Sequence, residues 1–276
     1  MIRPVLVLAA EEFQEGLRNR WVISSLMLLA TLAFSLALLG ASPIGETRAS
    51  ALNVTTVSLA SLSVYLIPLI ALTLSYDSIV GERERGTLLL LMTYPISRWQ
   101  IVVGKFAGHF SIIAVAIVVG YGVSGIYVGA TSEVEVRDWI LFASMLASSL
   151  MLGSAFIALG YLISVVVSSR ASAAGLSISI WLFMVVIFDL LLLGLVLADS
   201  EGVVSTELFA GLLLLNPADI YRLFNLAGSD AASLVSGSLG ALDDSFLSPG
   251  LLLGILSLWL FVPLITAIWI FKRHEL

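Results

Sequence analysis

The sequence has no cysteine among its 276 residues, which excludes disulfides, thiol catalysis and thiolate metal sites. It has only two histidines, His109 and His274, which lie too far apart in the sequence to form a histidine-rich metal cluster on their own. The methionines are scattered, and Met145 and Met151 are too far out of helical register to stack on one helix face. The residues therefore predict no metal site in this chain, for copper or any other metal.

Motifs for catalysis are absent as well. A P-loop needs the pattern G-x-x-x-x-G-K-[ST], in which backbone N–H groups hold the phosphates, but the one Gly-Lys pair, Gly104-Lys105, is followed by Phe106. The H-E-x-x-H and G-x-S-x-G patterns of metalloproteases and hydrolases do not occur either. The sequence predicts no catalytic residue and no cofactor, so any energy from ATP must enter through another protein.

Charge is scarce and apolar residues are abundant. Charged residues make up 12% of the chain and hydrophobic residues 59%, with a mean hydropathy of +1.08, whereas soluble domains are about 25% charged. The net charge of −6 argues against a nucleic-acid partner. This composition is typical of a protein that crosses a lipid bilayer several times.

Six apolar runs are long enough to cross the membrane. A helix needs about 20 apolar residues to span the hydrocarbon core, and the runs are Trp21–Ala41, Val54–Tyr76, Phe106–Gly129, Trp139–Val167, Ser172–Ala198 and Pro249–Phe271. The sequence therefore predicts an all-α integral membrane protein that forms a single domain over residues 1–276. Gly104 and Gly108, four positions apart around the start of the third run, favour a close approach between helices.

The first 20 residues are too polar to span. Leu6, Ala9, Phe13 and Leu17 recur at helical spacing, which predicts an amphipathic elbow helix on the membrane surface, with the nearby acids, Glu12 among them, mainly on its other side. The alternative is an ordinary charged lead-in to the first span.

Positive charges predict the orientation. Six spans place both termini on the same side as residues 77–105, and ten of the 13 lysines and arginines fall on that side. Positively charged loops stay in the cytoplasm, so both termini are predicted to be cytoplasmic in a multi-pass protein. Most acids fall on the other side.

Residues 77–105, called the connector below, form a dense run of charge between the second and third spans. Pro95 lacks an N–H and biases Tyr94 away from helical angles, while Ser97 can cap a new helix. We expect an extension of the second span, a short helix across the inner face, and a turn into the third span. The alternative is a solvated loop that orients the protein by its charge alone.

The outer segment, residues 199–248, has its own helix signals. Ser205 can cap one helix, and Asn216-Pro217 is a favourable start for another, with the asparagine as N-cap and the proline in the first turn. Residues 228–244 are rich in Ser, Gly and Asp and are typical of a flexible loop. The short helices are predicted to serve as a docking surface or a lid, or simply to pack on the outer helix ends.

Two ionisable residues lie within spans. Asp189 is predicted either to line a pathway or pair across a dimer interface, or to lie near the outer boundary and reach water. His109 is expected to form a hydrogen bond to a neighbouring helix rather than to bind metal.

The connector resembles the inner-loop signature of ABC-2 type permeases, the membrane subunits of ATP-driven exporters of the type V architecture. The likeness is carried by G-E-R-E-R-G-T-L from Gly81, T-Y-P-I-S-R from Thr93, and Gly104-Lys105. The six spans, the amphipathic start and the long segment before the last span also fit that family. The stretch N-P-A-D-I-Y-R from Asn216 is similar to an outer motif of its copper-associated members.

This resemblance implies a permease of the bacterial inner membrane that works as two copies in membrane lipid with two cytoplasmic ATPase subunits, which bind the ATP and magnesium. In copper-associated members it also implies a secreted β-helical partner on the periplasmic face and a role in assembling the copper centre of nitrous oxide reductase. ATPase coupling is predicted for Glu82, Glu84, Gly86, Tyr94, Pro95 and Arg98, and outer-partner docking for Asn216, Pro217, Tyr221 and Arg222. The alternatives are a stand-alone channel or secondary transporter and, less favoured by the motifs, a membrane enzyme.

Overall fold

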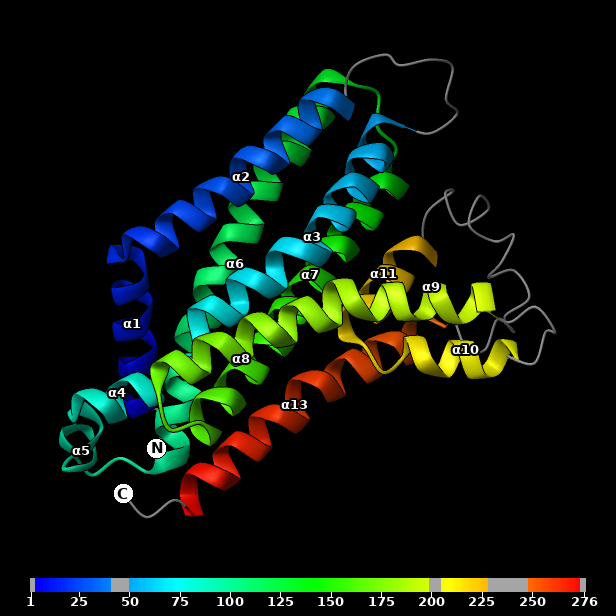
Figure 1. Ribbon diagram of the computed structural model, residues 1–276. Coiled ribbons are helices and arrows are strands. Elements are labelled where there is room, and N and C mark those ends of the chain that lie inside the picture. The colour runs from blue at the N-terminus through cyan, green and yellow to red at the C-terminus, as the bar shows by residue number, and fades with distance from the viewer. Residues whose placement is uncertain (1–2, 41–49, 199–204, 228–247, 274–276) are drawn as a thin grey trace.

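The computed structural model describes residues 3–40, 50–198, 205–227 and 248–273, and in these residues the chain is helical with no strand. Figure 1 shows the arrangement. The helices are α1 (Arg3–Arg18), α2 (Arg20–Gly40), α3 (Ala51–Ser75), α4 (Val80–Arg85), α5 (Thr87–Met92), α6 (Arg98–Thr131), α7 (Val136–Val166), α8 (Arg170–Leu182), the π-helix η1 (Phe183–Ile187), α9 (Phe188–Ala198), α10 (Thr206–Leu213), α11 (Pro217–Ala227) and α13 (Pro249–Arg273). The predicted loop at residues 228–244 lies outside the described residues.

The six predicted spans are confirmed. By length and hydropathy, the helices that can cross a membrane are α2, α3 continued by α4, α6, α7, α8 continued through η1 to α9, and α13. The third span begins at Arg98, well before the apolar run, because Ser97 and Gln100 form a capping box at its start. As a result Lys105 and His109 lie inside a long helix.

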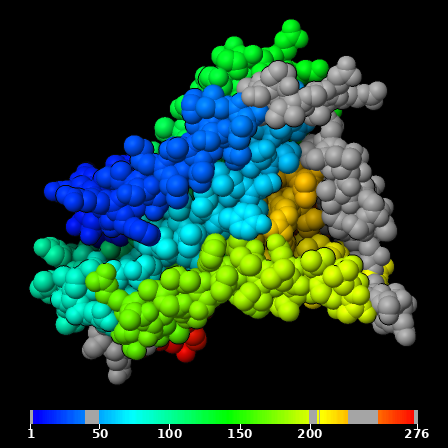
Figure 2. Space-filling model, turned by 45° about the horizontal axis from the view of Figure 1, so that its top comes forward, coloured from blue at the N-terminus to red at the C-terminus, as the bar shows by residue number. Residues whose placement is uncertain are grey.

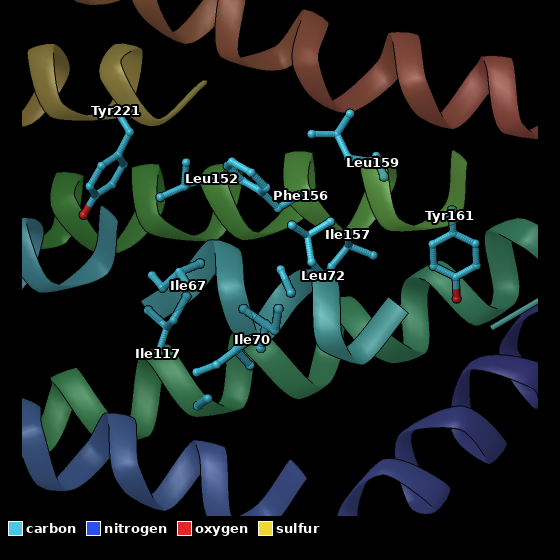
Figure 3. Packing of buried hydrophobic residues seen from close by; sticks show 14 of the residues in the cluster. Ile67, Ile70, Leu72, Ile117, Leu152, Phe156, Ile157, Leu159, Tyr161 and Tyr221 are labelled. Atoms are coloured by element: carbon cyan, nitrogen blue, oxygen red, sulfur yellow. The ribbon is translucent and has the colours of Figure 1, made fainter. Parts of the chain in front are cut away.

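Helix α7 is the centre of the bundle. It is the most deeply buried span, and α3 and α13 pack against it, while α1 and α2 pack against α6. The central layer contains Leu72 from α3, Ile117 from α6 and Phe156 from α7, all fully buried. Figure 3 shows these side chains between two buried tyrosines, Tyr161 and Tyr221, which lie toward opposite ends of the bundle.

Each end of the bundle carries its own set of short elements. The start of α1, helices α4 and α5, and the end of α13 lie together at one end, called the connector end, and α11 and the turn between α6 and α7 lie toward the other (Figure 1). Arg98 fixes this arrangement, since its guanidinium donates to the carbonyl oxygens of Phe271 at 2.9 Å and Lys272 at 3.1 Å. The start of α1 and the end of α13 are therefore both near the connector, as the sequence indicates. Which compartment they face stays a prediction.

Helix α1 forms, but one of its acids is placed differently from the prediction. Leu6 and Leu17 of the apolar stripe are exposed, as a membrane-surface helix requires. Glu12, in contrast, faces α6. The close approach depends on glycine, because a Cβ added at Gly104 would lie 2.8 Å from the Leu8 Cβ, and one at Gly108 would lie 2.9 Å from the Ala9 carbonyl oxygen.

The fifth span lies at the edge of the bundle. It is the least buried of the six, and in Figure 2 α8 and α9 run along one border of the molecule beside α3. The exposed side chains are large and apolar, among them Phe183, Leu190 and Leu197. In a bilayer this surface contacts lipid or another protein.

Candidate functional site: the connector and its buried ion pairs

A charged cluster lies inside the connector end. The Lys105 ammonium is 2.5 Å from Glu12 Oε2 and 2.9 Å from Glu82 Oε1, and its side chain is only 7% exposed. His109 Nε2 lies 3.0 Å from Glu12 Oε1. His109 Nδ1 lies 2.8 Å from the Tyr161 hydroxyl. This buried network, made of these five residues, joins α1, α4, α6 and α7, and it confirms the expected hydrogen bond from His109 to a neighbouring helix.

The charges in the network stabilise one another. Burial of the Glu12 carboxylate raises its pKa, but the hydrogen bond and charge of His109, together with Lys105, outweigh burial and lower the pKa to about 2. Glu12 is therefore ionised at neutral pH. A lysine with two carboxylates around it has its charge compensated, whereas loss of one partner from such a buried pair is costly.

Helix α4 is also fixed to α7. The Ser164 hydroxyl accepts hydrogen bonds from the N–H groups of Ile79 at 2.9 Å and Val80 at 3.0 Å, which satisfies two of the backbone donors left free at a helix start. The Arg83 guanidinium donates to the carbonyl oxygens of Ser164 at 3.3 Å and Val167 at 2.6 Å. Helix α4 thus binds the end of α7 through both its first turn and its side chains.

A second set of contacts joins α4 to the start of α8. The Glu84 carboxylate accepts the backbone N–H of Arg170 at 2.9 Å. The Arg170 guanidinium lies 2.6 Å from Asp77 Oδ2. Arg85 approaches the same oxygen at 3.9 Å. The turn between the fourth and fifth spans is therefore held against the connector by charge.

Beyond α4 the chain reverses direction and becomes exposed. Gly86 has φ of +73°, and a Cβ there would meet no atom within 4 Å, so the glycine is needed for its left-handed backbone rather than for space. Helix α5 buries Leu88 at 1% exposure, but leaves Leu89 and Leu90 at 59% and 66%. With Tyr94, 64% exposed, these two leucines form an apolar surface called the tip.

The residues predicted for ATPase coupling divide into two groups. Glu84, Gly86, Tyr94 and Pro95 are exposed at or near the tip. Glu82 and Arg98 are not free surface charges, because Glu82 pairs with Lys105 inside the network and Arg98 binds the end of α13. These two residues thus have internal partners, and contact with an ATPase stays a prediction for all six.

The prediction of outer-partner docking is corrected for three residues of the motif. Asn216, Pro217 and Tyr221 are buried, because α11 packs against α13, α7 and α3. Asn216 caps α11 by accepting the Ala218 N–H at 3.0 Å, as its sequence position indicates. The Tyr221 hydroxyl lies 2.9 Å from the Ser149 hydroxyl. These side chains hold α11 in place rather than offering surface to another protein.

Asp189 has a partner in its own chain that sequence reasoning missed. Its carboxylate accepts two hydrogen bonds from Arg222, at 3.0 and 2.9 Å, and Arg222 also donates to Asp219 at 2.7 Å. Beside this cluster, the side chain of Asn216 donates to the Met184 carbonyl oxygen in η1 at 2.6 Å. The pairing explains how an acid is tolerated in the fifth span; a role for Asp189 in a pathway or dimer interface stays a prediction.

Other residues of the connector end also escaped sequence reasoning. Glu12 and Asp77 gave no motif, and each forms its shortest ion pair with a residue 93 positions away. Ser164 lies in an apolar run where a serine has no local signal. In the described part of the chain no group of three or more His, Cys, Asp or Glu side chains could hold a metal ion.

The fold and the connector define a class of protein. It is an α-helical membrane protein with six spans, in which a short amphipathic connector between the second and third spans packs against the other helices. Comparison with known proteins gives the family. Residues 6–276 match the family model of the ABC-2 family transporter proteins, so the chain belongs to this family.

Two relatives agree with this assignment over nearly the whole chain. The chain is 43% identical over 270 residues, covering 97% of both chains, to a protein of Stutzerimonas stutzeri named "Probable ABC transporter permease protein NosY". It is 42% identical over 274 residues, covering 99% of both chains, to a protein of the same name from Pseudomonas aeruginosa. The chain is thus a NosY-like permease subunit of an ABC transporter.

Proposed function

We propose that this permease receives mechanical force from a separate cytoplasmic ABC ATPase at the tip, and that α4 passes it to the spans. The observation that carries the proposal is the contrast between the two connector helices. Helix α5 presents Leu89 and Leu90 to solvent, while α4 is held by buried ion pairs and hydrogen bonds. A force on α5 is therefore transmitted to α1, α6 and α7 together, because all three share the buried network with α4.

The surroundings of the tip suit a basic, partly apolar partner. A hollow of about 240 Å³ lies between α1 and α5, lined by four carboxylates, a lysine and apolar side chains that include Leu90 and Tyr94. Apolar anchors with charged groups around them are typical of protein interfaces. An ATPase surface that inserts an arginine or lysine beside an apolar contact would be complementary.

The working unit we propose is two copies of this chain with two ATPase subunits, which bind the ATP and magnesium, in a bacterial inner membrane with both termini cytoplasmic. The exposed apolar surface of the fifth span supports a second copy as its partner, because a single copy leaves most of that helix uncovered. The permease itself supplies no catalytic group. The likeness to proteins named NosY supports a role in assembling the copper centre of nitrous oxide reductase, with a β-helical protein on the periplasmic side.

The coupling proposal is tested by replacing an apolar residue of the tip. Leu90→Asp places a charge on the tip, and Val136→Asp places the same charge at the first position of α7, where Val136 is 77% exposed. Each variant is purified with its ATPase, and ATP hydrolysis and co-purification are measured. We expect Leu90→Asp to lower both by at least about tenfold, the effect of losing roughly 1.4 kcal/mol of interface energy, and Val136→Asp to change neither. Equal hydrolysis and recovery in all forms would contradict the proposal.

A stand-alone channel or secondary transporter makes the opposite prediction. Its transport would survive removal of every ATPase and would be insensitive to Leu90→Asp. Reconstitution of the purified chain alone in vesicles separates the two, since the driven permease is expected to be inert there.

A further inference from the structure

We propose that the cavity between α1, the end of α3, α4 and α8 binds the headgroup of phosphatidylethanolamine, with its ammonium group inward and its phosphate at the rim. The cavity measures about 490 Å³. Residues of four spans and of the elbow helix line it, and Figure 2 shows the face on which α1 and α2, α3 and α8 lie next to one another. It adjoins the buried network, since Glu12, Glu82 and Lys105 form part of its wall.

Three residues of the cavity wall carry a buried oxygen with no hydrogen-bond partner: Ser177 Oγ, Glu82 Oε2 and Asp77 Oδ1. Ser177 lines the cavity and is only 1% exposed. Buried polar atoms nearly always have a partner, and unpaired ones call for an unseen one. Carboxylate oxygens are acceptors, so what this wall requires is a group rich in N–H or O–H donors.

The unpaired carboxylate oxygens of Asp77 and Glu82 give the sign of that group. Four carboxylates, Glu12, Glu15, Asp77 and Glu82, share the wall with two arginines, Lys105 and His109. Lys105 is already shared between Glu12 and Glu82, and Glu15 is exposed. A primary ammonium, with three donors and one positive charge, matches this unbalanced set of acceptors.

The rim of the cavity has the opposite character. Arg85 and Arg170 have side chains 50% and 45% exposed, and both guanidinium groups approach the same oxygen of Asp77. A guanidinium has five N–H donors, so each retains donors for a further anion, and arginine is well suited to phosphate. Hydrogen-bond acceptors deep in the cavity and donors at its rim fit a zwitterionic headgroup that binds with its ammonium group inward and its phosphate at the rim.

Another part of the cavity wall is apolar, which indicates that the zwitterion carries acyl chains. Trp21 of α2, Leu69 of α3 and Ile178 of α8 line the same cavity, and Trp21 and Ile178 are 67% and 53% exposed on the surface of the spans. A tryptophan at the start of a span is typical of headgroup depth. Acyl chains can continue along α2 and α8, whereas a soluble amine would leave this apolar part uncovered.

The experiment compares lipids on the full-length protein purified in detergent, by native mass spectrometry and by thermal unfolding. We expect phosphatidylethanolamine to remain bound and to raise the unfolding temperature. Phosphatidylcholine, whose quaternary ammonium has no N–H donor, phosphatidylglycerol, which has no cation, and free phosphoethanolamine, which has no acyl chains, should each have a much smaller effect. Equal effects of phosphatidylethanolamine and phosphatidylcholine would overturn the proposal, and so would full binding of free phosphoethanolamine.

Two variants test the assigned groups. Ser177→Ala removes the buried hydroxyl with little change in volume, and Ser179→Ala, on an exposed face of the same helix, is its control. Arg85→Gln weakens the rim at an exposed position, so it tests the site even where Ser177→Ala fails to fold. We expect Ser177→Ala and Arg85→Gln to bind phosphatidylethanolamine about tenfold more weakly, the loss of a charge-assisted hydrogen bond, and Ser179→Ala to bind normally. Unchanged binding in Arg85→Gln, or equal loss in Ser179→Ala, overturns the site.

Discussion

The Lys105 ammonium lies 2.5 Å from the Glu12 carboxylate, although the two residues are 93 positions apart in the chain. This contact joins the N-terminal helix to the third span, and Glu82 joins α4 to the same lysine. One buried cation therefore holds three helices that are separate in the sequence. Any movement of the connector must either carry α1 and α6 with it or break a buried ion pair.

Removal of the central cation tests this relationship. Lys105→Met retains most of the side-chain length but leaves two buried carboxylates facing each other, so we expect the free energy of unfolding to fall by about 3–5 kcal/mol. Lys272→Met, at an exposed position near the end of α13, is the matched control and should change little. The measurement is the apparent unfolding temperature in detergent. Equal temperatures for the two variants would show that the pairs do not hold the helices together.

The backbone of Gly86 gives a second prediction. A residue with a Cβ is strained at positive φ by roughly 1–2 kcal/mol, and nothing else lies near this position. Gly86→Ala should lower stability and misdirect α5, while Gly86→Asn, which tolerates left-handed angles, should be milder. Gly122→Ala, at a helical glycine that also has no neighbour within 4 Å, should not destabilise the protein. A loss in Gly122→Ala as large as that in Gly86→Ala would exclude the backbone explanation.

Acid should weaken the connector end through Glu12. Its pKa is lowered to about 2 from an ordinary value of 4.5, so the folded state binds a proton less readily than the unfolded state. The resulting stabilisation, about 3 kcal/mol, is complete above pH 4.5 and is lost as pH falls from 4.5 toward 2. Glu12→Gln should be less stable at pH 7 and should show a shallower decline in unfolding temperature between pH 5 and pH 3. Parallel declines would contradict this assignment.

Local signals account for what the sequence predicted well. Ser97, Ser205 and Asn216 each precede a helix whose first turn they cap, and capping depends on residues only two or three positions away. Apolar run length likewise decides whether a helix can cross a membrane. These features need no knowledge of the fold, so the spans and the breaks in the connector followed from composition and spacing.

Long-range pairing accounts for what the sequence did not predict. The sequence does not reveal a partner for Glu82, because that partner, Lys105, lies in another helix. The helical spacing of Ile220 and Leu223 in α11 is consistent with their burial, but the enclosure of Tyr221 depends on Ser149 of α7. The π-helix at Phe183–Ile187 had no sequence signal. Its Met184 carbonyl oxygen accepts a hydrogen bond from Asn216, a contact that exists only after α11 packs.

The cluster around Arg222 gives the last prediction, and its sign is opposite to that of Glu12. Burial raises the pKa of Asp219, repulsion by Asp189 adds to it, and attraction by Arg222 opposes it, leaving a pKa of about 7 in place of 3.8. One guanidinium cannot fully compensate two carboxylates, of which Asp219 is buried, so the folded state takes up a proton that the unfolded state does not hold between pH 3.8 and 7.

This cluster should therefore favour the folded state increasingly as pH falls from 8 toward 5. Asp219→Asn keeps the shape of the side chain and removes the titration, so its unfolding temperature should vary less over that range and should exceed that of the unmodified protein at pH 8. Glu207→Gln, on α10 outside the cluster, is the control. If Asp219→Asn and Glu207→Gln show the same pH profile, Asp219 is not the group that takes up the proton.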